Sequence, residues 1–121
     1  MYTVKVKDHI MIAHSLPDEY FGPASNMHGA TYVVEVSFMN AHLNSKNVVI
    51  DIGEATEITK RVLSELAYQN LDELERFHGI LTTTEFLAGY IHGKIKKQLI
   101  EPLRLKVELL ESHVASASFE N

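Results

Sequence analysis

The sequence predicts an α+β domain in which one antiparallel sheet carries two helices on a single face. Three observations support this class. Residues 2–14 and 28–38 alternate between apolar and polar side chains, as half-buried strands do. Residues 51–66 and 82–99 repeat apolar side chains at helical spacing, and residues 103–109 alternate again. The expected order is therefore strand, strand, helix, helix, strand, strand, with two hairpins flanking a helix pair.

The first predicted hairpin brings two histidines together. In its first strand the mostly apolar face ends at His14. In its second strand one face begins with His28 and continues through Ala30, Tyr32, Val34, Val36 and Phe38. Residues 15–26, rich in Pro, Gly and Ser, form the loop between the strands. An antiparallel ladder that sets Ile12 near Ala30 would place both imidazoles on one face, close to each other.

Each predicted helix begins at a capping box, in which one side chain accepts a backbone N–H and a Glu three residues later reaches back. Asp51 with Glu54 marks the first start, and Thr82 with Glu85 marks the second. The apolar face of the first helix consists of Ala55, Ile58, Val62, Leu63 and Leu66. That of the second consists of Leu87, Tyr90, Ile91, Ile95 and Leu99, and the helix ends near Pro102.

The third predicted strand ends its apolar face with a carboxylate. Residues 103–109 alternate, and Glu111 occupies the next position on their apolar face. We expect residues 111–113 to form a turn and residues 114–119 to form the fourth strand. A small four-stranded sheet with one uncovered face and free outer strands favours assembly of several copies. The sequence therefore predicts a homo-oligomer.

Composition narrows the class of protein. A chain of 121 residues with 45% hydrophobic content fits one domain, residues 1–121. It contains no cysteine, which excludes disulfides and a thiol nucleophile. No run approaches the roughly 20 apolar residues of a membrane span, so we expect a cytoplasmic protein with no membrane partner. The formal charge of −5 and the scattered basic residues also argue against a nucleic-acid partner.

His14, His28 and Glu111 form a predicted polar cluster at the ends of apolar faces. Polar side chains are costly to bury unless they are paired, so their convergence calls for a partner. Zinc is one such partner, because neutral imidazoles bind it well and a catalytic zinc usually has three protein ligands. The alternative is that the imidazoles only hydrogen-bond to nearby backbone. Spacing alone leaves both readings open.

Several motifs together resemble one family, the 6-pyruvoyl and 6-carboxytetrahydropterin synthases. They are Ala13-His14, His28-Gly29-Ala30-Thr31-Tyr32, Val49-Ile50-Asp51-Ile52, Thr83-Thr84-Glu85 and Glu111-Ser112, in the family's order. The resemblance implies the T-fold, in which sheets of several subunits join into a barrel, usually in a hexamer of two trimers. It also implies a zinc-assisted reaction on the side chain of 7,8-dihydroneopterin triphosphate, with the pterin ring held by a glutamate.

The resemblance assigns the pterin end of the site more completely than the catalytic end. Glu111 matches the glutamate that anchors the pterin, and Thr83 with Glu85 matches part of the motif that lines the same pocket. His14 and His28 match two of the family's three zinc histidines, while Ala30 stands where the third is expected.

The family's acid-base and nucleophile residues are missing. No cysteine stands near Ala24, and Ala67-Tyr68 replaces an Asp-His pair. Residues 15–27 also contain no Lys or Arg that could bind a triphosphate. His113, two positions after Glu111, is a candidate replacement ligand for zinc and a candidate proton-transfer residue.

The leading hypothesis is a divergent family member that binds a pterin-like heterocycle between subunits and lacks the standard synthase activity. One alternative is a zinc-dependent synthase with a modified ligand set. A third reading is a non-catalytic pterin sensor or scaffold.

Overall fold

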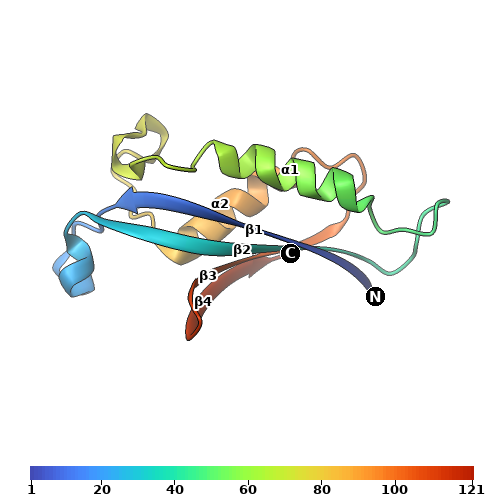
Figure 1. The fold of residues 1–121 in the computed structure, drawn as a ribbon, viewed down its shortest axis with the longest axis horizontal. Helices are drawn as coiled ribbons and strands as arrows, with labels where there is room; N and C mark the ends of the chain where they lie inside the picture. The colour runs from blue at the N-terminus through green and yellow to red at the C-terminus, as the bar shows by residue number, and fades with distance from the viewer.

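The computed structural model describes all 121 residues and contains the predicted order of elements (Figure 1). The first hairpin consists of strands β1 (Tyr2–His14) and β2 (His28–Asn40). Helices α1 (Ile52–Ser64) and α2 (Thr84–Lys96) follow. The second hairpin consists of β3 (Arg104–Ser112) and β4 (Ala115–Glu120).

The four strands form one antiparallel sheet in the order β1-β2-β3-β4. Figure 1 shows both helices on the same side of this sheet. The predicted α+β class and its order of elements are therefore confirmed. The other face of the sheet carries no helix, as in the predicted arrangement, and β1 and β4 are its outer strands.

The predicted register of the first hairpin is also confirmed. Ile12 pairs with Ala30, and the last residue of β1, His14, pairs with the first residue of β2, His28. The pairing runs without interruption from this end of the ladder to Tyr2, which faces Asn40. An unbroken ladder matters for the site because a slip of one residue would move every side chain to the opposite face.

The core lies between the sheet and the helices. It contains 24 buried hydrophobic residues, and β2 and β3 supply its centre. Tyr32, Val34, Val36 and Phe38, the predicted apolar face of β2, are each at most 1% exposed. On the helices, the buried side chains Ile58, Val62, Leu87, Ile91 and Ile95 complete the packing. The two elements that carry the histidines are thus fixed to the most buried part of the protein.

One of the two predicted helix starts is correct and the other is wrong by one residue. The Asp51 side chain accepts a hydrogen bond from the backbone N–H of Glu54, as expected. At α2 the capping residue is Thr83, whose hydroxyl accepts from the N–H of Phe86 at 3.1 Å. Thr82 therefore lies outside the helix, and its hydroxyl serves a different contact at the site described below.

The second hairpin also differs from the prediction at its turn. β3 continues through Ser112, and the turn consists of residues 113–114, so the expected turn at 111–113 was wrong. The register shifts between Leu110 and Ser112, which places a bulge at Glu111. Glu111 is therefore the extra residue of the bulge in β3 and not part of the turn. β4 accordingly begins at Ala115 instead of residue 114.

Three residues of the long connection between the helices pair with the free edge of β1. The N–H of Tyr68 donates to the carbonyl of Met11 at 2.7 Å, and the N–H of Ala13 donates to the carbonyl of Gln69 at 3.0 Å. Ala13 also forms a parallel bridge with Asn70. Tyr68 takes a positive φ of 61° here, an uncommon conformation for a residue with a side chain. This short edge segment leads directly into η2 (Leu71–Glu73), beside the site.

No helix in the structure has both the length and the apolar character needed to cross a bilayer.

Candidate functional site

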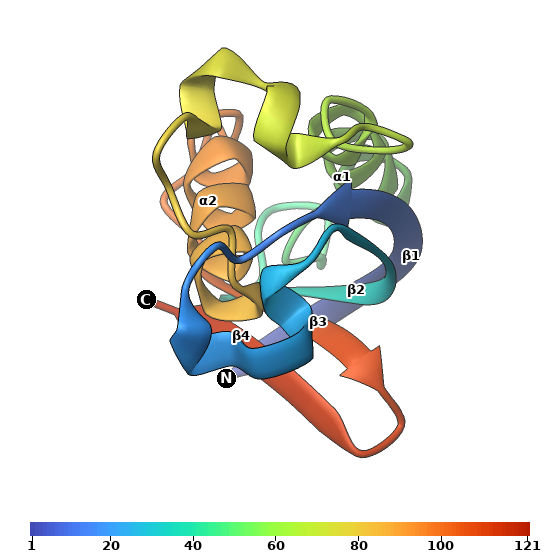
Figure 2. The same cartoon turned by 90° about the vertical axis from the view of Figure 1, so that its left-hand side faces the viewer.

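His14 and His28 lie at one end of the sheet, where β1 ends and β2 begins, and Figure 2 views the molecule from this end. Their ring centroids are 4.6 Å apart, with an angle of 64° between the ring planes. The predicted approach of the two imidazoles is therefore confirmed. We call this end of the molecule the histidine end.

The His14 ring is buried and held by Thr82. His14 is 3% exposed, and its Nδ1 lies 3.0 Å from the hydroxyl oxygen of Thr82, which is 1% exposed. Burial lowers the pKa of His14 below its usual 6.5, the neighbouring His28 lowers it further, and Asp72 and Glu111 oppose this change. His14 is therefore a neutral imidazole near pH 7. Sequence reasoning missed Thr82 because it assigned this residue to the helix cap.

His28 is half-buried and held by the backbone of the preceding loop. Its Nδ1 lies 2.8 Å from the carbonyl oxygen of Asn26. A carbonyl oxygen can only accept, so Nδ1 of His28 carries a hydrogen that it donates. In the neutral ring the free lone pair is then on Nε2. That nitrogen can accept a hydrogen bond from a ligand or bind a metal ion.

Asp72 fixes the chain immediately after His14. Its carboxylate accepts hydrogen bonds from the backbone N–H of Ser15, at 3.0 and 3.2 Å, and from the Ser15 hydroxyl. Asp72 belongs to η2, whose first turn is capped by the side chain of Asn70. The loop that follows contains the 3-10 helix η1 (Glu19–Ser25), which lies at the same end of the molecule (Figure 2).

A cavity of about 330 Å³ brings Glu85 and Glu111 together. It lies between the first turn of α2 and the second hairpin, and its lining includes Thr84 and residues 115–118 of β4. Thr83, predicted to bind ligand, is not part of this lining, because its hydroxyl caps α2. The neighbouring Thr84 lines the cavity instead of Thr83. Both glutamates are solvent-exposed.

Tyr32 contacts Thr84, which lines this cavity, and was not predicted as a site residue. It is 1% exposed, and its hydroxyl oxygen lies 3.5 Å from that of Thr84. Burial raises the pKa of Tyr32, and Glu111 and Glu85 raise it further, against the effect of Thr84. The phenol is therefore a neutral hydrogen-bond donor. Its place on the His28 face of β2, four residues after that histidine, was the available sequence signal.

The residues of a single chain do not fit a three-ligand zinc site. No three His, Cys, Asp or Glu side chains come together in a way that could hold a metal ion. His113 lies exposed in the turn between β3 and β4 and does not join His14 and His28 in such a group. The chain provides two imidazoles, whereas a catalytic zinc usually has three protein ligands.

The site therefore offers hydrogen-bonding chemistry from several kinds of group. The carboxylates of Glu85 and Glu111 accept hydrogen bonds, and the Thr84 hydroxyl can donate or accept. The buried imidazole of His14 is a neutral base, and the half-buried imidazole of His28 lies beside it. This set suits a flat ligand with several N–H donors.

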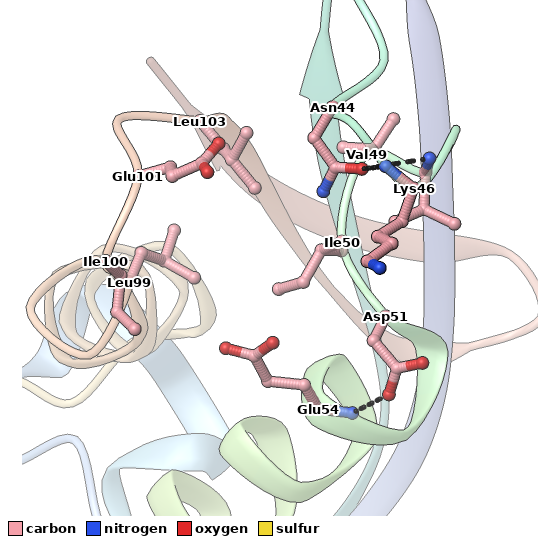
Figure 3. A pocket seen from close by; sticks show the side chains of 11 residues that line it. Asn44, Lys46, Val49, Ile50, Asp51, Glu54, Leu99, Ile100, Glu101 and Leu103 are labelled. Carbon is pink, nitrogen blue, oxygen red and sulfur yellow. Dashed lines mark hydrogen bonds between the residues drawn. The ribbon is translucent and has the colours of Figure 1, made fainter.

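A second cavity, of about 320 Å³, lies at the opposite end of the sheet (Figure 3). It lies between the segment before α1 and the segment after α2, and its apolar lining includes Ile50, Leu99 and Leu103. Glu54 and Lys46 are among its charged residues, and no histidine lines it. His14, His28 and the two glutamates of the first cavity lie at the histidine end. We treat that end as the candidate functional site.

A four-stranded antiparallel sheet with two helices on one face, and histidines at the end of its first hairpin, defines a protein of the T-fold class. The structure of 6-pyruvoyl tetrahydropterin synthase from Caenorhabditis elegans superposes on this chain with a TM-score of 0.88 at 25% sequence identity. That match covers 99% of this chain and 95% of the other. The enzyme of the same name from Plasmodium falciparum shares the fold, with a TM-score of 0.79 at 16% identity over 99% of this chain and 97% of the other.

The family model described as 6-pyruvoyl tetrahydropterin synthase matches residues 3–121. The chain therefore belongs to the 6-pyruvoyl tetrahydropterin synthase family. It is 34% identical over 94 residues to a 6-pyruvoyl tetrahydrobiopterin synthase from Dictyostelium discoideum, covering 76% of this chain and 69% of the relative. A Drosophila melanogaster protein of the same name is 35% identical over 88 residues, covering 69% of this chain. This match spans about half, 52%, of the Drosophila protein.

Proposed function

We propose that this protein binds a pterin-like heterocycle in the Glu85–Glu111 cavity and lacks the standard synthase activity of its family. The observation that supports this most directly is the meeting of Glu85 and Glu111, from α2 and β3, on one cavity of about 330 Å³. Ligand pockets in proteins commonly begin at roughly 300 Å³. Glu111 also matches the position of the family's pterin-anchoring glutamate, which supports its role as the anchor here.

The hydrogen-bonding groups of a pterin ring and of the cavity are complementary. A pterin ring presents an amino group and ring N–H groups along one edge, and a carboxylate such as Glu111 can accept two of these hydrogen bonds. Hydrogen bonds to a charged acceptor are stronger than those between neutral groups. Glu85, which lines the same cavity, can accept a further hydrogen bond. Thr84 can then orient the ring from the α2 side.

A second subunit would complete this cavity in our proposal. β4 is an outer strand of the sheet, and residues 115–118 of this strand line the cavity, so a neighbouring copy that joins β4 would cover it. The proposal therefore includes a homo-oligomer, with a hexamer expected from the family, in the cytoplasm.

The proposal of lost synthase activity depends on residues that are absent from the sequence. Ala30 stands in place of the third zinc histidine, and Ala67-Tyr68 in place of the Asp-His pair. The chain contains no cysteine. The remaining candidates for proton transfer are His14, His28 and His113, because histidine titrates near neutral pH.

A zinc-dependent synthase with a modified ligand set is the second candidate function. The names of the relatives from Dictyostelium and Drosophila, 34% and 35% identical to this chain, favour it. In this case a ligand from a neighbouring subunit would have to join His14 and His28. A pterin sensor or scaffold without catalysis is compatible with the same cavity.

Binding is tested with the natively purified protein and a panel of pterins and purines, by thermal shift and then by calorimetric titration. A ligand that binds the folded state must raise the apparent stability. Glu111→Gln should weaken pterin binding by about 10- to 100-fold, as expected for loss of a hydrogen bond to a charged group. Glu101→Gln, at the opposite end of the molecule, is the matched control and should bind like the wild type. Absence of any shift with every pterin would refute the binding proposal.

Catalysis is tested separately. Metal analysis of protein purified without chelator, and incubation with dihydroneopterin triphosphate while triphosphate release is followed, distinguish the two candidate functions. Zinc near one equivalent per chain together with triphosphate release would establish the synthase and overturn our first choice. Unchanged metal content in His113→Ala would remove that residue as a ligand.

A further inference from the structure

The second cavity, at the end of the sheet opposite the histidines, has the volume of a ligand pocket. It measures about 320 Å³, and ligand pockets in proteins commonly begin at roughly 300 Å³. Its lining comes from residues 44–54, which lead into α1, and from residues 99–103, which follow α2. No residue of β1 or β4 lines it. The cavity is therefore formed within one chain, apart from the sheet edges through which copies would join.

Much of the surface of this cavity is apolar. Val49, Ile50 and Leu103 line it and belong to the hydrophobic core. Leu99 and Ile100 continue the apolar surface after α2, and Ile100 is 93% exposed. An apolar group placed against these side chains would remove both its own surface and theirs from water, which favours binding. The cavity therefore suits a ligand with an aliphatic or aromatic part.

Two carboxylates without partners line the same cavity. The sequence predicts that Glu54 reaches back to the N–H of Asp51, but only the opposite bond forms, from the N–H of Glu54 to the Asp51 side chain at 3.0 Å. Figure 3 shows the Glu54 carboxylate directed away from Asp51 and into the cavity. Glu101 enters from the segment after α2. Neither carboxylate forms an ion pair in the chain, so both are available to a cationic group.

The turn before α1 brings two nitrogen groups to the cavity. The side-chain oxygen of Asn44 accepts from the N–H of Lys46 at 2.9 Å and from the N–H of Val48 at 3.3 Å, which fixes the orientation of the amide. The amide nitrogen of Asn44 is left as a free donor, and Figure 3 shows it on the cavity side. The ammonium group of Lys46, from the same turn, forms no ion pair in the chain. This wall can therefore bind an anionic group.

We propose that this cavity binds a free α-amino acid with an apolar side chain. The ammonium group of the ligand donates to Glu54 and Glu101, and its carboxylate accepts from Lys46 and Asn44. Its side chain covers the apolar surface around Ile50. A ligand with a single charge would leave one of the two polar walls without a partner. A peptide terminus carries only one of the two charges, so the free amino acid fits better than a peptide.

The test is isothermal titration calorimetry of the intact protein with leucine, isoleucine, methionine and phenylalanine. At least one of them should bind with a Kd of about 1 mM or tighter, as expected for a small ligand with two charged contacts. Glycine should bind at least about tenfold more weakly, because it lacks the apolar part. The amine and the carboxylic acid that correspond to the best amino acid (for leucine, 3-methylbutylamine and 4-methylpentanoate) should each bind at least about fivefold more weakly.

Variants of the two polar walls locate the ligand. Glu54→Gln and Lys46→Gln should each weaken binding by about 3- to 10-fold, since each removes one charged partner at an exposed position. Glu57→Gln and Lys60→Gln, on α1 but outside the cavity, are the matched controls and should bind like the wild type. Glu111→Gln, in the other cavity, should also bind like the wild type.

Three results would overturn the proposal. The first is that none of the four amino acids binds. The second is that glycine, the amine or the acid binds as tightly as the best amino acid. The third is that the affinity is unchanged in both Glu54→Gln and Lys46→Gln, or falls in Glu111→Gln, which would place the ligand elsewhere. None of these results bears on pterin binding, because the two cavities share no residue.

Discussion

The contact between Thr82 and His14 provides a quantitative test of how the site is held. Thr82→Val keeps the shape of the side chain and removes the hydroxyl. Nδ1 of His14 then loses a partner at 3.0 Å, in a place where both residues are at most 3% exposed. A buried polar group left without a hydrogen bond costs about 1–3 kcal/mol. We expect the free energy of unfolding to fall by that amount.

Urea denaturation followed by circular dichroism measures this change, at one fixed protein concentration because an oligomer's stability depends on it. With a slope of roughly 2 kcal/mol per molar urea, the midpoint should fall by about 0.5–1.5 M. Thr82→Ser is the matched control, since it keeps the hydroxyl and loses only one methyl group, worth about 1 kcal/mol. If Thr82→Val were as stable as the wild type, or more stable than Thr82→Ser, the hydrogen bond would not be what holds His14.

Three further predictions concern stability. Burial lowers the pKa values of His14 and His92 below 6.5, so just below pH 6.5 the unfolded chain binds more protons than the folded one, and stability should fall as the pH decreases from about 7 to 5. His92→Gln should reduce this slope in urea titrations at several pH values, and a pH-independent wild-type midpoint would contradict the reasoning. Asp51→Ala removes the cap of α1 and should cost about 1 kcal/mol, whereas Asp51→Asn should cost less, as measured by urea unfolding. Phe38→Ala empties a fully buried position and should cost about 3–5 kcal/mol in the same assay; a loss below 1 kcal/mol would mean that the core collapses to fill the space.

Periodicity in the sequence was sufficient to predict the first hairpin. The alternation that ends at His14 and resumes at His28 predicted which residues pair, because each apolar face had to meet the same core. The Asp51 cap was predictable for a similar reason, since the capping residue and the amide it binds are three positions apart. Strand alternation and helix caps depend on residues close together in the chain, so one sequence is enough to predict them.

Contacts between distant parts of the chain were not predictable in this way. Thr82 and Thr83 are both residue types that can cap a helix, and in the structure Thr83 caps α2 while Thr82 contacts His14, which is 68 positions away. The attachment of Asp72 to Ser15 joins residues 57 positions apart. The bulge at Glu111 likewise depends on how β4 pairs, which the pattern of β3 alone does not show.

The edge segment of residues 68–70 limits how much of β1 another strand can use. Met11 and Ala13 turn their backbone groups toward this edge, and both are already bonded. Because backbone groups alternate in direction along a strand, Thr3, Lys5 and Lys7 retain outward groups that are free to pair, whereas the N–H of His9 already donates to the Asp8 carboxylate. Any strand that extends the sheet on this side must therefore bind beside the amino-terminal two thirds of β1. At the histidine end, the edge of β1 is already paired with residues 68–70 of the same chain. A strand from another chain therefore cannot extend the sheet there.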